Sequence, residues 1–216
     1  MRFLGKLSNR ERIIISFLVV LVLLNILTIV TSRNLTDFSQ DFKSMLEDRL
    51  VPSFDLAKIQ EQFYRNRLNL EELVYMEENE EIKKVISKIR VNNDIIDQIE
   101  AKYAKTNLTV DEANRLNEFN THVKNYRRIE NEIIRNIENK QFEAANTVYL
   151  RESIPAFEKL LDTTHKLEDI QITVGHKLYK NAQKKVRSIQ VLAYLSLGIA
   201  IMITVNMLKV LQIKVK

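Results

Sequence analysis

The side chains that could do chemistry in this chain are few. Its 216 residues include three histidines and no cysteine, which excludes thiolate chemistry and disulfide bonds. Di-iron helical bundles need several glutamates and paired Glu-x-x-His motifs, but His122, His165 and His176 each lack a glutamate three positions earlier. His165 and Glu168 form a lone His-x-x-Glu pair, which is typical of a helix surface. Because a glycine-rich phosphate loop and a nucleophile with its base are also missing, we expect a protein that is not an enzyme and uses no metal or cofactor.

A second group of polar residues interrupts apolar patterns. Asn66 and Asn92 each occupy a position where an apolar residue is expected, and they lie at similar distances from a predicted connection at residues 77–79. We therefore expect them at nearly the same height in the fold. A buried polar layer of this kind can fix the register of packed helices at a cost in stability, or it can line a polar ligand pocket. Thr164 and Gln171 indicate a second polar layer.

The elements that position these residues follow from the apolar spacing. Four segments carry apolar residues at alternating intervals of three and four, which is the pattern of a helix seam in coiled coils and bundles. The seams are Leu56, Ile59, Phe63, Asn66, Leu70 and Leu73; Ile82, Val85, Ile89, Asn92, Ile96, Ile99 and Tyr103; Leu116, Phe119, Val123 and Tyr126, with Ile133 and Ile137 after a slip in the spacing; and Phe157, Leu160, Thr164, Leu167, Gln171, Val174 and Leu178.

Short connections between the seams predict the topology. We expect turns at 77–79, 105–108 and 139–140, and a helix that begins after Thr109 with a capping box to Glu112. The chain has only 3 glycines and 2 prolines, too few for a fold rich in turns. The sequence therefore predicts an all-α fold, with an antiparallel four-helix bundle.

Two uncharged apolar runs flank the bundle, from Ile13 to Val30 and from Ser188 to Leu208. Each is long enough to cross a bilayer as a helix. The first exceeds the apolar length usual in a cleaved signal peptide. Both outer flanks are short and basic, so they should stay in the cytoplasm. The predicted organisation is a cytoplasmic flank 1–12, a transmembrane helix 13–31, an extracytoplasmic bundle 32–187, a transmembrane helix 188–208 and a cytoplasmic tail 209–216.

The basic residues of these flanks account for the formal net charge of +5. That charge therefore gives no argument for a nucleic-acid partner, and the lipid bilayer is the expected environment.

The first and last helices should be longer than the two between them, which leaves a two-helix stalk next to the membrane. Its apolar residues are Leu35, Phe38, Phe42 and Met45 on one side and Val174, Leu178, Ala182 and Val186 on the other. Two helices bury little surface, so we expect the stalk to pack against a second copy. Asp37 and Asp41 should lie level with Lys180 and Lys177.

Two prolines fall within helical patterns. Pro52 and Pro155 each remove one backbone hydrogen bond and are expected to bend or break their helices. The residues before the second proline, 151–154, are predicted to form a break that exposes backbone groups near the asparagine layer.

Longer segments resemble a known family. The segment from Asp48 to Tyr75, DRLVPSFDLAKIQEQFYRNRLNLEELVY, resembles the first helix of the four-helix-bundle sensor domain of bacterial methyl-accepting chemotaxis receptors. The segment from Leu108 to Tyr149, LTVDEANRLNEFNTHVKNYRRIENEIIRNIENKQFEAANTVY, is similar to the third helix, the following turn and the start of the fourth helix. Both apolar runs lie where this family has its membrane anchors, so the resemblance covers nearly the whole chain.

The resemblance implies a periplasmic ligand-binding bundle, usually a homodimer, in the bacterial inner membrane. Its last helix would pass small movements to a cytoplasmic or membrane signalling partner. We therefore expect a sensor of a small polar ligand or a periplasmic protein. Only eight residues follow Leu208, so the relay helices and methylated hairpin of the family are not in this sequence. The alternatives are the N-terminal fragment of a full receptor and an interaction protein that binds no ligand.

The resemblance also suggests site residues, because amino-acid-sensing members hold a ligand carboxylate with arginines of the first helix. The planar guanidinium suits this role since it binds both oxygens. Arg65 and Arg67 are the nearest match, but a spacing of two puts them on different faces. In the alternative interpretation, the arginine stems only cover apolar neighbours. The predicted ligand-binding residues are Arg65, Asn66, Arg67, Asn92, Arg127 and Arg128.

Overall fold

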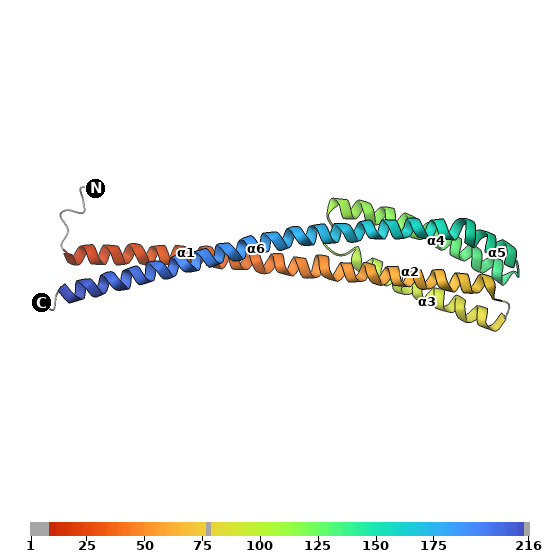
Figure 1. Cartoon of the computed structure of the whole chain (residues 1–216), viewed down its shortest axis with the longest axis horizontal. Helices are drawn as coiled ribbons and strands as arrows, with labels where there is room; N and C mark the ends of the chain where they lie inside the picture. Colours follow the sequence, from red (N-terminus) through yellow and green to blue (C-terminus); the bar gives the residue numbers. More distant parts are fainter. Residues whose placement is uncertain (1–8, 77–78, 214–216) are drawn as a thin grey trace. The chain divides into compact units, whose positions relative to one another are not determined.

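The computed structural model describes residues 9–76 and 79–213, and every element in that part of the chain is helical (Figure 1). In chain order these are α1 (Asn9–Met45), the π-helical turn η2 (Leu46–Leu50), α2 (Val51–Tyr75), α3 (Asn79–Tyr103), α4 (Val110–Glu138), α5 (Phe142–Val148), the π-helical turn η3 (Tyr149–Ser153) and α6 (Ile154–Ile213). The backbone divides into two compact units. Residues 44–177 form one, and the segments before 44 and after 177 form the other.

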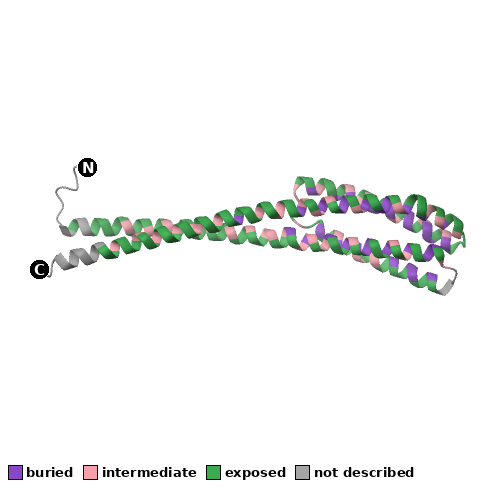
Figure 2. Cartoon of the chain, viewed as in Figure 1, coloured by how far each residue is buried: buried purple, intermediate pink, exposed green. Residues whose placement is uncertain are grey.

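The unit 44–177 is a four-helix bundle made by α2, α3, α4 and the helix that runs from α5 through η3 into α6. The seam residues are buried except Asn92, Val174 and Leu178, which are partly exposed (Figure 2). Aromatic rings fill the centre: Phe63 of α2 meets Phe119 and Tyr126 of α4 edge-on, with centroids 6.4 and 5.9 Å apart, and Tyr126 lies 5.9 Å from Phe157 of α6. Burial of such side chains is the main stabilising contribution to the bundle. The predicted all-α four-helix bundle is confirmed.

The connections have clear chemical causes. Thr109 accepts a hydrogen bond from the Glu112 amide while the Glu112 carboxylate accepts one from the Thr109 amide, so the predicted capping box is confirmed. At the end of α4, Lys140 adopts a left-handed conformation with φ 60°. The Gln141 amide then donates to Asn136 and the Lys140 amide to Ile137, which is a Schellman ending. Part of the predicted turn at 77–79 lies outside the described residues.

The two prolines do not break their helices, so the predicted break at residues 151–154 is wrong. In each case a π-helical turn precedes the proline: the Val51 amide donates to Leu46 before Pro52, and the Ile154 amide donates to Tyr149 before Pro155. A proline ring collides with the carbonyl four residues earlier in an α-helix. The wider turn moves that carbonyl, so the chain stays helical through residues 151–154 instead of breaking there.

The other unit contains α1 up to Lys43 and α6 from Leu178. Each helix is long and apolar enough to cross a bilayer by length and composition, and neither apolar run is buried within the protein. Lys185 donates to Asp41 over 2.6 Å, so Asp41 has a different partner from those predicted. Of the predicted stalk residues in this unit, Ala182 is buried, whereas Leu35 and Phe42 are about half exposed. The basic residues Arg2, Lys6, Lys214 and Lys216 lie outside the described residues.

Candidate functional site

A polar layer crosses the bundle at Asn66, whose side chain has no exposed surface. Its amide nitrogen donates to Asn93 Oδ1 (2.9 Å), and its oxygen accepts from Asn92 Nδ2 (2.8 Å). Asn93 Nδ2 in turn donates to Glu130 Oε2 over 2.9 Å. These bonds link α2, α3 and α4 at one height, as the spacing of the two asparagines predicts. We call Asn66, Asn92, Asn93 and Glu130 the Asn66 layer.

Glu130 is the charged member of this layer and is only 2 % exposed. Burial raises the pKa of its carboxyl from 4.5 to about 7, opposed by the hydrogen bond from Asn93 and by the nearby positive charge of Arg127. The guanidinium of Arg127 forms its ion pair with Asp97 instead, over 2.6 Å. Among the described residues, Glu130 has no ion-pair partner and its Oε1 has no hydrogen-bond partner.

Two buried hydroxyls lie close to the Asn66 layer. Tyr126 lies one helical turn before Glu130 on α4, and Ser153 is the last residue of η3. Neither hydroxyl makes a hydrogen bond of full geometry among the described residues, but the two approach each other closely enough for Ser153 to lower the pKa of Tyr126. Burial, with the negative charge of Glu130 second, holds the pKa of Tyr126 far above its usual value. Buried polar groups are nearly always paired, and π-helical turns occur frequently at functional sites, so this cluster is the strongest candidate for a responsive site.

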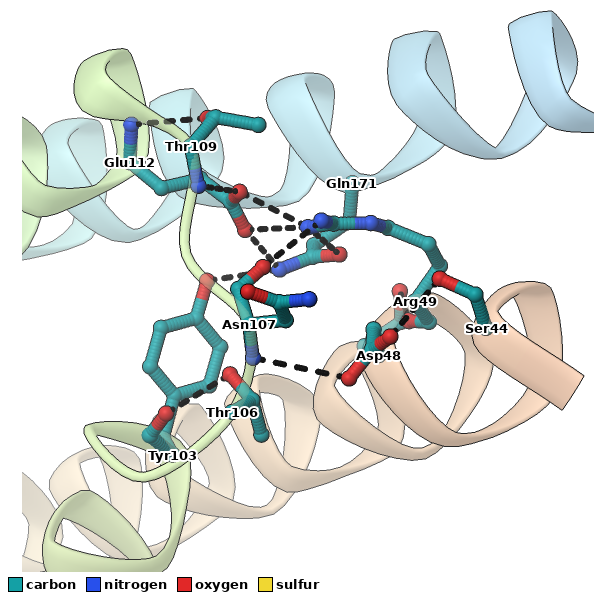
Figure 3. A network of polar contacts seen from close by, with 10 residues as sticks. Ser44, Asp48, Arg49, Tyr103, Thr106, Asn107, Thr109, Glu112 and Gln171 are labelled. Carbon is teal, nitrogen blue, oxygen red and sulfur yellow. Dashed lines mark hydrogen bonds and ion pairs between the residues drawn. The ribbon is translucent and has the colours of Figure 1, made fainter. Parts of the chain in front are cut away.

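A second polar cluster forms around Arg49, in η2, and is drawn in Figure 3. The guanidinium Nη1 donates to both oxygens of Glu112 at 2.7 Å and to Gln171 Oε1 at 3.3 Å, and Nη2 donates to the Asn107 carbonyl at 2.8 Å. Gln171 Nε2 donates to the Tyr103 hydroxyl over 2.7 Å and to Glu112. We call Arg49, Tyr103, Glu112 and Gln171 the Arg49 layer. It ties η2, the end of α3, the start of α4 and α6 together.

The Arg49 layer differs from the Asn66 layer because its buried charges are paired. Glu112 has no exposed surface and faces the cation of Arg49, while it also caps α4. Burial raises the pKa of Tyr103 to about 12, opposed by its hydrogen bond with Gln171. The Asp48 carboxylate completes the cluster by accepting bonds from the Ser44 hydroxyl (2.7 Å) and the Asn107 amide (3.4 Å) (Figure 3). Gln171 forms the predicted second layer, whereas the Thr164 hydroxyl donates to Leu160 of its own helix.

The predicted site residues are only partly brought together. Asn66 and Asn92 are bonded to each other, and Arg127 lies beside them, donating to the Asn93 carbonyl over 3.3 Å. The guanidinium of Arg67 stacks on the Phe157 ring at 5.0 Å. The two remaining arginines point to the surface.

Arg65 and Arg128 are those two surface arginines. Arg65 pairs with Glu61 on its own helix, and Arg128 pairs with Glu132 and Glu152. The side chain of Arg65 is 61 % exposed, so it covers little of the core.

Glu130 and Arg49 were not identified from the sequence as members of the polar layers, although the sequence contains a signal for each. The slip in the third seam does not exist, because Tyr126, Glu130 and Ile133 continue the alternation of four and three. The first seam likewise extends backwards from Leu56 through Arg49. A charged residue on an otherwise apolar seam therefore marks each polar layer.

No group of three or more potential metal ligands occurs among the described residues. His165 lies on the surface, 3.3 Å from Glu168 and 3.4 Å from Gln60.

Comparison with known proteins adds one finding. The model of a family described as a four helix bundle sensory module for signal transduction matches residues 6–186, which includes the whole bundle and both polar layers. The match confirms the resemblance seen in the sequence. No curated protein and no solved structure matches the chain.

Proposed function

Because the chain belongs to the family of four-helix-bundle sensory modules for signal transduction, we propose that it is a membrane-anchored, extracytoplasmic sensor of chemoreceptor type. Domains of this family are sensors and typically not catalytic. In this proposal a small polar ligand or a periplasmic protein acts on the bundle, and a cytoplasmic partner receives the signal.

The continuity of α6 is the observation that carries the proposal. This helix begins beside the Asn66 layer after η3, contributes Gln171 to the Arg49 layer, and continues through the apolar run from Ser188. A change in the bundle that favours one position of α6 therefore also acts on the membrane segment. Coupling of this kind typically amounts to about 1–3 kcal/mol.

The proposed topology places both termini in the cytoplasm of a bacterium and the bundle outside the inner membrane. The two apolar helices support it by their length, and the basic flanks support it by the positive-inside rule. The bundle boundaries at 32 and 187 remain part of this proposal.

The proposed oligomer is a homodimer formed along the outer side of η2 and α2. Exposed apolar side chains lie along this side at intervals built from three and four residues, which is the spacing two copies of one helix need to pack together. They are Leu46, Leu50, Phe54, Tyr64, Leu68 and Tyr75. Phe54 and Leu68 are 68 % and 64 % exposed, so a second copy would remove a large apolar area from water.

The second candidate function is a scaffold that binds no small ligand and modulates another membrane protein. The direct hydrogen bonds between Asn66, Asn92 and Asn93 favour it, because bonds between helices can fix helix register without any ligand.

One experiment separates the two functions. The full-length protein is crosslinked in native membranes, purified, and its partners identified; its thermal unfolding is then followed with a set of small polar compounds. The sensor proposal predicts saturable stabilisation by at least one compound, reduced by Asn66→Ala and retained by the exposed control Asn131→Ala. Recovery of a stable membrane partner without stabilisation by any compound would support the scaffold instead.

A further inference from the structure

We propose that the proton is a ligand of the Asn66 layer, bound by the Glu130 carboxyl, and that its binding changes how α4 meets η3. This inference rests on the proposed sensor function and names one input to it. It assigns a site and a ligand class inside the bundle, away from the surface arginines Arg65 and Arg128.

The hydrogen bonds of the layer all run toward the carboxyl. Asn92 donates to Asn66, Asn66 donates to Asn93, and Asn93 donates to Glu130 Oε2. The second oxygen, Oε1, is buried and has no hydrogen-bond partner in the part of the chain that the structure describes. A carboxylate accepts at both oxygens, whereas a carboxylic acid carries a donor on one of them. Oε1 is therefore the atom at which proton binding changes the bonding of the layer.

A proton on Oε1 would need a hydrogen-bond acceptor, and the two buried hydroxyls are the candidates. Tyr126 lies on the same face of α4 one turn away, and Ser153 belongs to η3, packed against α4 and α2. A hydroxyl oxygen can accept from a protonated carboxyl, and the Tyr126 and Ser153 hydroxyls, which interact with each other, are the groups that can turn to do so. When the carboxyl is ionised, the same hydroxyls must turn to donate, or water must enter. Protonation and ionisation thus favour different arrangements of η3, which is already widened in front of Pro155.

The charged neighbours do not neutralise Glu130. From α4, Arg127 is held by Asp97 of α3, and from α2 Arg67 stacks on Phe157. On η3, the Tyr149 hydroxyl donates to Glu71 over 3.2 Å. The ionisable groups facing the layer are Arg67, Glu71, Asp97, Arg127, Tyr126 and Tyr149. Desolvation is therefore the main influence on this carboxyl, and it raises the pKa to about 7.

The test uses the full chain in lipid nanodiscs. The protein has no native cysteine, so spin labels attach only at introduced sites, here Lys124→Cys on α4 and Leu150→Cys on η3, both exposed. Distances between the labels are measured by double electron–electron resonance from about pH 5 to about pH 9. We expect a shift between two distance distributions with a midpoint near 7.

Two variants make the result specific. Glu130→Gln copies the neutral acid in shape and should remain in the low-pH distribution at every pH. Glu138→Gln, an exposed position on the same helix, should keep the shift. Infrared spectra of the unsubstituted protein, which need no variant, should lose a buried protonated-carboxyl band over the same range.

Three results would overturn the inference: no distance shift with pH, a shift that persists in Glu130→Gln, or no titrating buried carboxyl. If a polar compound or protein ligand still moved the labels at constant pH, the sensor function would stand. Only the proposal that the proton is one of its ligands would be wrong. If neither pH nor any ligand moved them, the sensor function itself would be contradicted.

Discussion

Replacing Arg49 by methionine should destabilise the bundle by about 3–5 kcal/mol, the usual effect of removing one member of a buried ion pair. Methionine keeps most of the apolar length of the arginine stem, so the change removes mainly charge and hydrogen bonds. The Glu112 side chain would then lie in the core with no cation beside it.

The structure shows where that energy arises. Arg49 donates to both Glu112 oxygens at 2.7 Å, to Gln171 at 3.3 Å and to the Asn107 carbonyl at 2.8 Å. The Asn107 carbonyl would lose this partner, which costs about 1–3 kcal/mol if the group stays buried. The larger contribution is the desolvated carboxylate of Glu112, which has no exposed surface. This loss is reduced because Gln171 and the Thr109 amide still donate hydrogen bonds to the Glu112 carboxylate.

The assay is chemical unfolding of the full-length protein in mild detergent, followed by circular dichroism of its helices. Arg65→Met is the matched control, because Arg65 makes a single exposed pair with Glu61 that is worth about 0.3–0.5 kcal/mol. A second comparison combines Arg49→Met with Glu112→Gln, which removes both charges. This pair should recover a large part of the loss, since an uncharged replacement of a buried ion pair is often near neutral.

A loss below about 1 kcal/mol for Arg49→Met would contradict a buried ion pair, because it would mean that the cluster is open to water. A double variant as unstable as the sum of its single variants would refute it as well. In that case the two charges would not interact, and the bonds to Gln171 and Asn107 would have to account for the effect.

Three further outcomes follow from the structure. Lys140→Gly should raise the free energy of unfolding by up to about 1 kcal/mol, because glycine adopts φ 60° without the steric cost that lysine carries; thermal unfolding of the full chain measures it. Glu130 has a folded pKa of about 7 against an ordinary 4.5, so its contribution to stability is complete below pH 4.5 and falls as the pH rises to about 7. That contribution is about 3 kcal/mol, measured as the pH-dependent difference in unfolding free energy between the unsubstituted protein and Glu130→Gln. Phe54→Glu with Leu68→Glu should abolish crosslinked dimers in membranes while the helical content is unchanged; dimers that survive both charges would place the interface elsewhere.

The fold could be predicted from the sequence because seam spacing is a strong, local signal. Six of the seven residues of the second seam are buried, and Asn92, the seventh, bonds to Asn66 as their common height indicates. The capping box at Thr109 followed from two residue types at a fixed interval. These features depend on neighbours along the chain, so they need no knowledge of the tertiary structure.

The polar partners could not be predicted in the same way. Glu112 was placed correctly as a cap, but its pairing with Arg49 joins residues far apart in the chain. The asparagine layer was predicted, but Glu130, the acceptor at its end, was not. The position of Glu130 was interpreted from the sequence as a slip in the spacing of the third seam. The prolines were misjudged for a different reason: a sequence pattern does not show that a helix can widen by one residue and continue.

The two polar layers are suited to different roles because the buried carboxylate is bonded at both oxygens in one layer and at a single oxygen in the other. In the Arg49 layer every carboxylate oxygen of Glu112 is bonded, so Gln171 holds α6 firmly. In the Asn66 layer Oε1 of Glu130 has no hydrogen-bond partner among the described residues, so a rearrangement that pairs it lowers the free energy of the bundle.

Ser153 and Gln171 are about 18 residues apart, or about 27 Å along the helix that contains both. A change at η3 therefore cannot slide α6 as a whole unless the bonds of Gln171 to Glu112 and Tyr103 also break. If those bonds hold, the motion passed along α6 is a rotation or tilt about Gln171. Gln171→Leu removes these bonds and should therefore allow α6 to move further. The expected result is a larger ligand- or pH-dependent movement of spin labels placed beyond residue 171. An unchanged movement would show that the Arg49 layer does not restrain α6.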